Sequence, residues 1–343
     1  MKLLLTGAAG WLGLNVLHLA RSARWTASLP QGGCRGLVLA GTPGHDVQKI
    51  APDMELLQGD IRSPEDCRKL CREAAGGLLI HTAGIIHPQR IRDFYEINLE
   101  GTRNLLQAAV EAGVKRAVIV SSNSPIGCNP HRDHQFDEES PYHPYMNYGR
   151  SKMLMEMAVK DFQREGEIET VILRAPWFYG PFQPPRQTLF FQMIRDGKMP
   201  VVGDGNNLRS MAYTENLAQG ILLAATQPQA AGETYWIADE RPYPMNEIVD
   251  TVERLLEQEF GQKCAHQRMR LPGLASEVAW VLDKSLQAVG IYQQKIHVLS
   301  EMNKTIACTV EKARRDLGYR PEVSLEEGMR RSIQWCLENG QPI

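Results

Sequence analysis

Short apolar runs alternate with amphipathic segments through the first half of the chain. The apolar runs lie at 3–6, 37–40, 54–60, 78–84, 115–122 and 169–176. Helix-like patterns separate them at about 11–24, at 63–74 with Ser63 as the expected N-cap, at about 90–112, and in a stretch that ends at about 164. Continuous apolar strands that alternate with helices predict a parallel sheet covered on both faces. Ligands of such sheets bind beyond the carboxyl ends of the strands.

The regular alternation loosens after about residue 176. A proline-rich stretch at 177–187 is followed by expected helices at about 187–196, 215–226 and 245–259 and by a strand near 233–238. We predict an α/β fold with a Rossmann-type doubly wound parallel sheet. Residues 1–176, with returning segments near 212–240, are expected to form its NAD(P)-binding domain. Residues 177–343 are expected to form mainly a smaller, interleaved C-terminal substrate-binding domain.

Three glycines follow the first apolar run at the spacing of a dinucleotide-binding turn. Gly7, Gly10 and Gly13 stand between that run and an amphipathic segment. Glycines there allow a tight turn, let the backbone approach a pyrophosphate, and present helix N-terminal N–H groups to it. Asp60 and the segment 81–84 each follow a later apolar run. They are expected to form the adenine-side and phosphate-side walls of the same site.

The second apolar run carries the signal for the choice of cofactor. NAD-selective sites usually place a carboxylate near the end of this strand, but this chain has Ala40, Gly41 and Thr42, with Asp46 several residues later. An absent carboxylate removes the repulsion of a 2′-phosphate and permits NADP. Arg35 sits at the opposite end of the strand and cannot clamp that phosphate. NAD and NADP both stay open, with a lean toward NADP.

Tyr148 and Lys152 are the strongest candidates for the chemistry. They stand four residues apart in a predicted helix and therefore lie on one face of it. An ammonium group so placed can lower the pKa of the phenol toward neutrality and hold a ribose hydroxyl at the same time. This chemistry suits hydride transfer at a carbinol or carbonyl carbon.

The composition of the chain argues against several classes of binding partner. The net charge is −2 and no block of like charges occurs, so nothing suggests nucleic acid or an anionic membrane. The seven scattered cysteines form no framework, and Cys67 and Cys71 lack a second pair of ligands. We therefore expect reduced thiols, no metal site and a cytoplasmic setting. No run of 18 apolar residues occurs, so no membrane span is expected.

Motifs along nearly the whole chain identify a family. They are TGAAGWLG (6–13), GDI (59–61), HTAG (81–84), YEINLEGTRNLL (95–106), VIVSSNSPIG (118–127), YGRSK (148–152), LRAPWFYGP (173–181), GDGNNLR (203–209) and RRDLGYRPEVSLEEG (314–328). With these motifs the chain resembles the extended short-chain dehydrogenases/reductases, which include NAD-dependent epimerases/dehydratases and 3β-hydroxysteroid dehydrogenases.

The resemblance implies roles for individual residues. Tyr148 would be the general acid/base, Lys152 its pKa modifier and ribose ligand, and Ser122 the hydroxyl that hydrogen-bonds the reacting oxygen. Asn98 would kink its helix, and Pro176 would lie beside the nicotinamide. The expected cofactor-binding residues are Gly7, Ala9, Gly10, Trp11, Leu12, Gly13, Gly41, Thr42, Asp60, Ile61, Thr82, Ala83, Gly84, Ser121, Tyr148, Lys152, Arg174 and Pro176. The expected substrate-binding residues are Ser124, Trp177, Phe178 and Arg209.

Two substrate classes remain open. Arg209 matches an arginine that contacts the diphosphate in sugar-nucleotide members, which favours a nucleotide-activated sugar whose alcohol or ketone carbon is oxidised, reduced or epimerised. Asn123 and Ser124 replace the acidic pair of dehydratases, and Ile126 replaces a tyrosine common in sugar epimerases. The alternative is an NADP-dependent dehydrogenase/reductase of a sterol, steroid or other apolar keto or hydroxy compound, favoured by aromatic residues after 176.

A third hypothesis is a non-catalytic NAD(P)-sensing protein on the same fold. Such proteins commonly lose the tyrosine or the lysine, and this chain keeps both. The resemblance also implies a homodimer whose interface is formed by the helices near 90–112 and 147–164.

Overall fold

The computed structural model describes residues 1–343, and a seven-stranded sheet runs through its centre. The strands are β1 (Leu3–Thr6), β2 (Cys34–Val38), β3 (Glu55–Gln58), β4 (Leu78–His81), β5 (Arg116–Ser122), β6 (Glu169–Ala175) and β11 (Thr234–Trp236). They lie in the order β11-β6-β5-β4-β1-β2-β3, and all neighbours are parallel. The predicted doubly wound parallel sheet is confirmed. Its strand order reverses between β1 and β4, where such sheets bind ligands.

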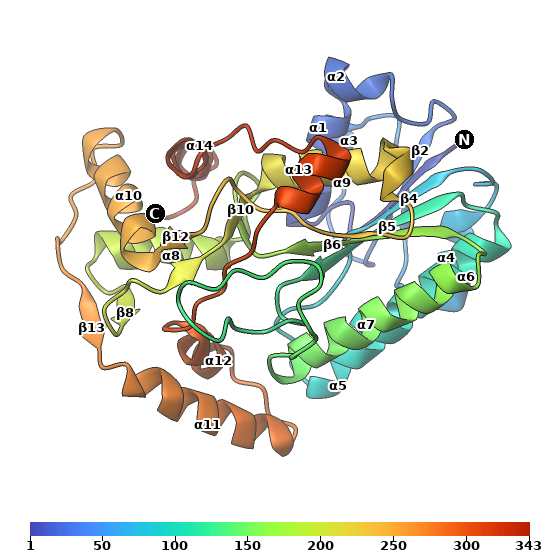
Figure 1. The fold of residues 1–343 in the computed structure, drawn as a ribbon. Coiled ribbons are helices and arrows are strands. Elements are labelled where there is room, and N and C mark those ends of the chain that lie inside the picture. Colours follow the sequence, from blue (N-terminus) through green and yellow to red (C-terminus); the bar gives the residue numbers. More distant parts are fainter.

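Helices cover both faces of this sheet (Figure 1). One face carries α4 (Pro64–Cys71), α6 (Thr102–Glu111) and α7 (Met146–Arg164), and the other carries α1 (Trp11–Ala20), α3 (His45–Ile50) and α9 (Thr214–Thr226). Successive strand residues point to opposite faces. Leu4 therefore packs into the core under α4, α6 and α7, whereas Leu3 and Leu5 pack into the core under α1 and α9.

A third hydrophobic cluster lies in the C-terminal half. Three helices contribute to it, namely α8 (Pro185–Arg195), α10 (Met245–Gln258) and α14 (Leu325–Glu338). Three strand pairs accompany them: β7 (Trp177–Tyr179) with β10 (Met211–Tyr213), β9 (Leu208–Arg209) with β12 (Tyr243–Pro244), and β8 (Pro200–Val202) with β13 (Met269–Leu271). After β10 the chain returns to the large sheet through α9 and β11.

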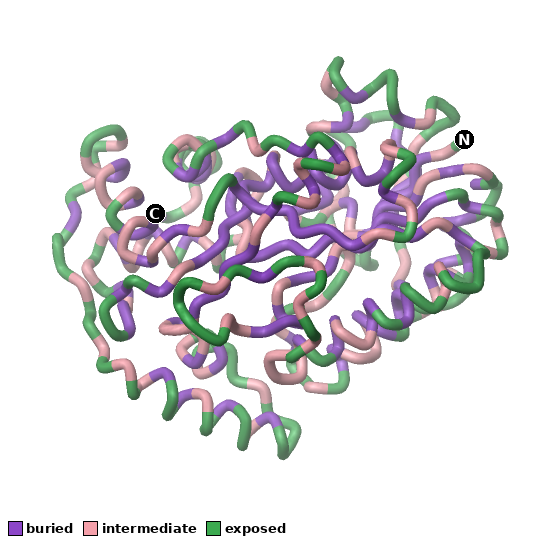
Figure 2. Tube along the Cα trace, viewed as in Figure 1, coloured by how far each residue is buried: buried purple, intermediate pink, exposed green.

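The remaining elements are short or lie toward the C-terminus. They are α2 (Ala23–Thr26), α5 (Ile91–Asp93), a 3-10 turn η2 (Pro228–Ala230), α11 (Leu274–Ala288), α12 (Gln294–Glu301) and α13 (Glu311–Leu317). Figure 2 shows the central strands buried and α11 largely exposed along the rim of the molecule. None of the helices combines the length and the hydropathy that crossing a bilayer requires.

Several predicted boundaries were wrong for identifiable reasons. The helix expected at about 11–24 ends at Ala20, and α2 is a separate helix. The strand expected at 37–40 occupies Cys34–Val38, because the chain buries Arg35 by pairing it with Glu55. The helix expected from 187 begins at Pro185, since proline suits the first turn of a helix. Ser63 caps α4 as predicted, accepting a hydrogen bond from Asp66 N at 3.2 Å.

The helix expected at about 90–112 is divided. α5 leads into a π-helical segment, η1 (Phe94–Gly101), before α6 begins. π-helical turns are rare and often mark functional sites. This segment contains Asn98, the residue whose family role is to kink this helix.

Candidate cofactor and active site

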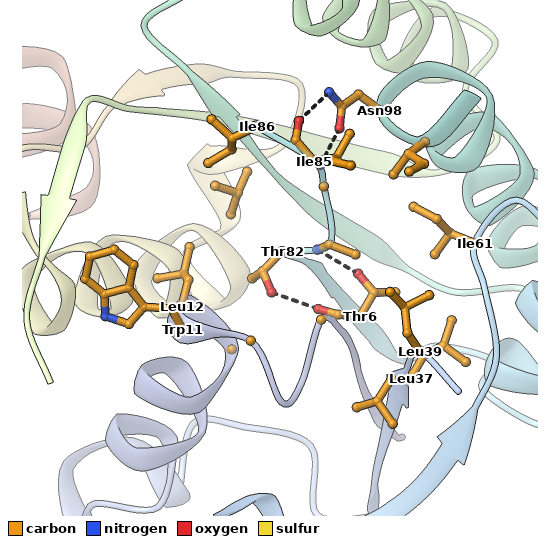
Figure 3. A pocket seen from close by; sticks show the side chains of 18 of the residues that line it. Thr6, Trp11, Leu12, Leu37, Leu39, Ile61, Thr82, Ile85, Ile86 and Asn98 are labelled. Atoms are coloured by element: carbon orange, nitrogen blue, oxygen red, sulfur yellow. Dashed lines mark hydrogen bonds between the residues drawn. The ribbon is translucent and has the colours of Figure 1, made fainter. Parts of the chain in front are cut away.

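A cavity of about 510 Å³ opens at the carboxyl ends of the central strands (Figure 3). It receives residues from the loops after β1, β2, β3 and β4, from the end of β5 and from α7. The predicted site residues that line it are Gly7, Ala9, Gly10, Trp11, Leu12, Gly13, Thr42, Asp60, Ile61, Thr82, Ala83, Gly84, Asn98, Ser121, Tyr148, Lys152 and Phe178. Segments far apart in the sequence therefore meet at one cavity.

The other predicted residues do not line the cavity. They are Gly41, Ser122, Ser124, Arg174, Pro176, Trp177 and Arg209. Gly41 adopts a φ of 80° in the turn after β2, and Ser122 and Ser124 are buried at the end of β5 and just beyond it. Trp177 packs edge-on against Phe190 within the C-terminal cluster.

The glycine turn after β1 is shaped by close backbone contacts. Gly7 has a φ of 69°, where side chains are disfavoured, and a Cβ on Gly13 would stand 2.1 Å from the Gly7 carbonyl oxygen. Gly10 is the N-cap of α1 and provides no side-chain cap. The first N–H groups of α1 therefore remain available to an anion. This cradle fits the pyrophosphate of a dinucleotide.

A buried hydrogen-bond network holds the wall formed by β1 and β4. The Thr82 hydroxyl donates to the Thr6 carbonyl oxygen at 2.8 Å, as Figure 3 shows. The ring of His81 bridges two hydroxyls, with Nδ1 at 2.6 Å from Thr6 Oγ1 and Nε2 at 2.9 Å from Thr102 Oγ1. Burial lowers the pKa of His81 to about 3, so this ring is neutral at ordinary pH.

The adenosine end of the cavity lies beside β2 and β3. No carboxylate stands directly after β2. Leu39 occupies that position, lines the cavity and is 58% exposed. Asp60 pairs with Arg62, whose Nη2 donates to Asp60 Oδ2 at 2.6 Å. Arg62 also lines the cavity, and its position two residues after Asp60 was the signal that could have identified it. Arg35 is turned away, donating to the carbonyl of Leu70 at 3.0 Å.

Tyr148 and Lys152 lie one turn apart on α7 and both line the cavity. Lys152 Nζ donates to the Val120 carbonyl at 2.9 Å and contacts Met155 Sδ at 3.1 Å. Burial lowers the pKa of Lys152 to about 8, and the carboxylate of Glu156 opposes this shift.

The pKa of Tyr148 differs from the expected direction. Burial raises the pKa of Tyr148 to about 12, and a hydrogen bond with the Ser122 hydroxyl acts in the opposite direction. The expectation that Lys152 draws this phenol toward neutrality is therefore wrong for the chain by itself. The physical reason is that the ammonium group of Lys152 is held at the Val120 carbonyl, so loss of hydration decides the pKa of the phenol.

Asn98 joins three parts of the site. Its Nδ2 donates to the Ile85 carbonyl and to Ser151 Oγ, both at 3.1 Å. Its Oδ1 accepts from Ile85 N at 2.9 Å, and Figure 3 shows both contacts with Ile85. Through these bonds the π-helical segment fixes the loop after β4 against α7, next to Tyr148.

Arg174, predicted to be a cofactor ligand, does not line the cavity. Its guanidinium is buried in an ion pair, with Nη2 at 2.9 Å from Glu156 Oε2. Glu156 also accepts hydrogen bonds from Ser121 Oγ at 2.6 Å and Tyr142 Oη at 2.8 Å. A buried carboxylate needs a cation and several donors. Arg174 therefore supports Glu156 behind Ser121 and Lys152 instead of reaching the cavity.

Arg209, predicted to be a substrate ligand, also does not line the cavity. It is buried, its Nη2 donates to the Glu301 carbonyl, and its Nε has no hydrogen-bond partner. β9 pairs with β12 and bridges to Ile306, which fixes Arg209 in the C-terminal half. The sequence motif alone could not show that α12 would take up this guanidinium.

The opposite end of the cavity is apolar and contains one cation. Trp11 packs against Phe178 with ring centroids 4.7 Å apart, and Trp11 Nε1 donates to the Pro181 carbonyl at 2.8 Å. Ile85 and Ile86 follow the motif at 81–84 and line the cavity, as does Arg186. Arg186 is exposed and forms no ion pair. The sequence pattern did not single out these last three residues, although Arg186 lies in the proline-rich stretch at 177–187.

No group of three or more His, Cys, Asp or Glu side chains is arranged to hold a metal ion.

Comparisons with known proteins place this site in a family. The model of the NAD-dependent epimerase/dehydratase family matches residues 3–238. The uncharacterized protein y4nL of Sinorhizobium fredii is 53% identical over 347 residues, covering 98% of this chain and 96% of that protein. The decarboxylating sterol-4-alpha-carboxylate 3-dehydrogenase of Saccharomyces cerevisiae is 28% identical over 303 residues, covering 83% of this chain and 84% of that enzyme.

Solved structures agree with the sequence relatives. The dTDP-glucose 4,6-dehydratase DesIV of Streptomyces venezuelae, crystallised with NAD and TYD bound, superposes with a TM-score of 0.78 at 25% identity. The match covers 99% of this chain and 98% of that structure. With the glycine turn, the Tyr148–Lys152 pair and these relatives in place, the chain belongs to the NAD-dependent epimerase/dehydratase family, whose members are NAD(P)-dependent oxidoreductases of the extended short-chain dehydrogenase/reductase type.

Proposed function

We propose that this protein transfers a hydride at a secondary alcohol or ketone carbon of a nucleotide-activated sugar, as an oxidoreductase or epimerase. One observation carries the catalytic part of this proposal: Tyr148 and Lys152 line the same cavity as the Gly7–Gly13 turn. A cofactor held by the turn and a substrate oxygen at the tyrosine can therefore meet inside one enclosure.

The residues present fit a nicotinamide dinucleotide. The Gly7–Gly13 turn would hold the pyrophosphate, Asp60 and Ile61 the adenine side, and Thr82–Gly84 the inner wall. When bound, the cofactor accepts a hydride from a carbinol carbon or supplies one to a carbonyl carbon.

Tyr148 is proposed to exchange the proton of the reacting oxygen. With its pKa near 12 in the chain by itself, the phenol is protonated at neutral pH and ready to donate a proton, as reduction of a ketone requires. Taking up a proton in the oxidative direction requires positive charge close to the phenol. Lys152 would supply part of that charge and hold the ribose, while Ser122 would orient the oxygen through its hydrogen bond with Tyr148.

Arg186 supports a substrate that carries a diphosphate. Its guanidinium lines the cavity and has no acidic partner, and arginine binds phosphate oxygens in bidentate geometry. It replaces Arg209, whose guanidinium is engaged by α12. The similarity to DesIV over nearly the whole chain also favours a sugar nucleotide. Asn123 and Ser124 replace the dehydratase acid pair, which favours reduction, oxidation or epimerisation over dehydration.

An apolar hydroxy or keto compound is the second candidate. Ile85, Ile86, Trp11 and Phe178 line the cavity, and half of its lining residues are hydrophobic. The sterol-4-alpha-carboxylate dehydrogenase among the relatives supports this alternative. The lack of a carboxylate after β2 would also suit NADP, with Arg62 as the cation at that end. NADP in place of NAD is thus part of the second candidate.

The first test identifies the nucleotide that the purified protein retains. The protein is denatured, the released nucleotide is identified by mass, and thermal shifts with NAD and NADPH are compared. Retained NAD at one equivalent supports a cofactor that is recycled within each turnover, as an epimerase requires. A protein that releases no nucleotide and is stabilised chiefly by NADPH supports a ketone reductase.

The second test asks whether the substrate carries a diphosphate. Calorimetry should show dTDP or UDP binding to the NAD-loaded protein, with affinity about tenfold weaker in Arg186→Ala. Arg320→Ala, which removes an exposed arginine that forms no ion pair and does not line the cavity, is the matched control. Absence of nucleoside diphosphate binding, together with binding of a sterol or steroid ketone, would replace the first candidate with the second.

We also propose the domain roles and the oligomer that the family resemblance implies. Residues 1–176, with β10, α9 and β11 from 212–240, would bind the cofactor, and residues 177–343 would mainly bind the substrate. A homodimer would form through the outer faces of α6 and α7. Met157, which is 48% exposed on α7, supports an interface there.

A further inference from the structure

Helix α11 has its apolar side outward. Leu274, Val278 and Val281 are 70%, 59% and 57% exposed and recur at a spacing that places them on one stripe. Ser276, Asp283 and Gln287, on the opposite side of the same helix, are buried. A surface helix normally buries its apolar stripe and exposes its polar one. α11 reverses that arrangement.

Buried hydrogen bonds hold α11 in this orientation. Ser276 Oγ donates to the Ser300 carbonyl at 2.8 Å, and His297 Nδ1 lies 2.7 Å from Asp283 Oδ2. Gln287 accepts a hydrogen bond from Asn147 Nδ2 at 2.9 Å, which connects α11 to the start of α7. Turning the apolar stripe inward would leave these buried groups without partners, which is costly. The outward stripe is therefore a fixed feature of the fold.

The apolar surface continues past the end of α11. We define the α11 face as Leu274, Val278, Val281, Leu282, Val289 and Ile291, all of which are exposed. Figure 1 shows α11 along the rim of the molecule, and Figure 2 shows much of it exposed. A contiguous exposed apolar surface marks a contact with a partner or with a membrane.

Three cations stand on α11 or in the segments that precede and follow it in the chain. Arg270, Lys284 and Lys295 are exposed and take part in no ion pair. Lys284 Nζ lies 4.9 Å from the centre of the Trp280 ring on the flank of the helix. The exposed acidic residue on α11, Glu277, is neutralised by an ion pair with Lys304. The apolar stripe is thus bordered by positive charge with no free acidic group on the helix.

We propose that the α11 face docks this protein on the surface of an anionic lipid bilayer. Aliphatic side chains would enter the boundary between headgroups and acyl chains, while Arg270, Lys284 and Lys295 would meet lipid phosphates. The 15 residues of α11 span about 22 Å, less than the roughly 30 Å of a bilayer core, so the helix lies along the surface.

Charge favours a bilayer over a second copy of the chain. In a twofold contact through the α11 face, each copy would present the same cations around the same apolar stripe. Like charges brought together at a contact oppose association, whereas anionic headgroups are complementary to them.

The docking surface is joined to the wall of the active site. The chain runs from Ile291 into Tyr292, whose hydroxyl lies 2.7 Å from His87 Nδ1. The Tyr292 ring packs edge-on against Phe94 with centroids 5.5 Å apart, and Phe94 lies 5.7 Å from the Tyr148 ring. Docking would therefore bring the catalytic tyrosine close to the bilayer. Docking through the α11 face does not depend on which substrate the cavity binds.

Vesicle flotation of the full-length protein tests the proposal. One vesicle type is phosphatidylcholine alone, and the other contains about one third phosphatidylglycerol to supply negative charge. We expect binding to the anionic vesicles, weakened by salt, and a loss of about tenfold or more in the double variant V278E/V281E. K284A/K295A should lower binding to the anionic vesicles specifically. Leu189→Glu, at a position 52% exposed on α8, is the matched control and should bind like the parent protein.

Three outcomes would overturn the proposal. The parent protein could fail to bind either vesicle type, or V278E/V281E could bind as well as the parent. The third is a parent protein that forms an oligomer which V278E/V281E dissociates, since the α11 face would then be an interface between copies. Circular dichroism and thermal unfolding establish that each variant is folded before its binding is compared.

Discussion

At the scale of single residues, burial decides the protonation of the site. Tyr148 is held protonated by loss of hydration, whereas Lys152 is pushed toward neutrality by the same effect. The charge of Glu156 favours the ammonium form of Lys152, and Arg174 in turn supports Glu156. The proposed acid/base pair of Tyr148 and Lys152 is therefore supported by the buried ion pair of Glu156 and Arg174, which does not line the cavity.

Tyr148→Phe should reduce hydride transfer by at least about 100-fold while affinity for NAD(P) stays within about twofold. The variant removes the proton donor and leaves the glycine turn intact. Turnover of the substrate found through the tests above is followed by NAD(P)H absorbance where the cofactor exchanges, and by chromatography of substrate and product where it is recycled. Affinity is measured by calorimetry. Tyr145→Phe is the control. Tyr145 precedes α7 and does not line the cavity, and its hydroxyl forms a hydrogen bond with Ser300. Turnover near the parental rate in Tyr148→Phe would remove the tyrosine from the mechanism.

His81 should give the protein a measurable loss of stability in acid. Its pKa is about 3 in the folded state against 6.5 in the unfolded chain, so below pH 6.5 the unfolded state binds a proton that the folded state does not. The free energy of unfolding therefore decreases as the pH falls from 6.5 toward 3, and at pH 5 it is roughly 2 kcal/mol lower than at neutral pH.

Urea unfolding of the parent protein and of His81→Asn, between pH 5 and pH 7.5, measures this effect. The variant should be less stable at pH 7.5, because Thr6 and Thr102 lose a partner, but its stability should change less with pH. Parallel pH profiles for the two proteins would show that His81 does not titrate as described.

At the scale of elements, the site depends on places where regular structure is interrupted. β1 ends in a turn that only glycines allow, and the helix before α6 opens into a π-helical segment around Asn98. Both interruptions bring backbone close to the cavity. The pattern at 90–112 predicts a helix, and the family resemblance adds only that Asn98 kinks it. The π-helical turn itself depends on contacts with Ile85 and Ser151, which no local pattern shows.

Gly13→Ala should destabilise the protein by about 1–3 kcal/mol and abolish its thermal stabilisation by NAD(P). The added Cβ would stand 2.1 Å from the Gly7 carbonyl oxygen, so α1 and the turn must separate. Gly273→Ala is the control, because its Cβ would meet nothing within 4 Å. Differential scanning fluorimetry with and without cofactor measures both. A normal cofactor-dependent shift in Gly13→Ala would contradict the role given to the turn.

At the scale of the whole molecule, two exposed surfaces have different expected partners. The outer faces of α6 and α7 are proposed to meet a second copy, and the α11 face is proposed to meet a bilayer. The overall net charge of −2 suggested no membrane, because the local excess of cations around α11 is cancelled elsewhere in the chain. The distribution of charge in space matters here more than its sum.

Met157→Asp should convert a dimer into monomers in sedimentation velocity experiments. A carboxylate placed in an apolar contact between helices loses its hydration without a partner. V278E/V281E should remain dimeric, which separates the α7 interface from the α11 face. A parent protein that sediments as a monomer, or a Met157→Asp variant that stays dimeric, would rule out this interface.

The sheet, the glycine turn and the Tyr148–Lys152 pair could all be predicted from the sequence. Each of these depends on local chemistry: apolar runs of strand length, glycines at fixed spacing, and two side chains one helical turn apart. Residues at strand ends converge wherever parallel strands share an edge. Most of the predicted cofactor ligands therefore reached the cavity without further information.

The positions of the Arg174 and Arg209 side chains and the orientation of α11 depend on contacts between distant elements and could not be predicted from the sequence. Arg174 and Arg209 both belong to family motifs. However, Arg174 forms an ion pair with Glu156, and Arg209 donates to the Glu301 carbonyl. These partners lie 18 and 92 residues away in the chain. α11 likewise faces outward because His297, Ser300 and Asn147 satisfy its polar side. A buried charged or polar group needs hydrogen-bond partners or an opposite charge. Which residues lie close enough to serve depends on the packing between elements, and local sequence patterns do not show it.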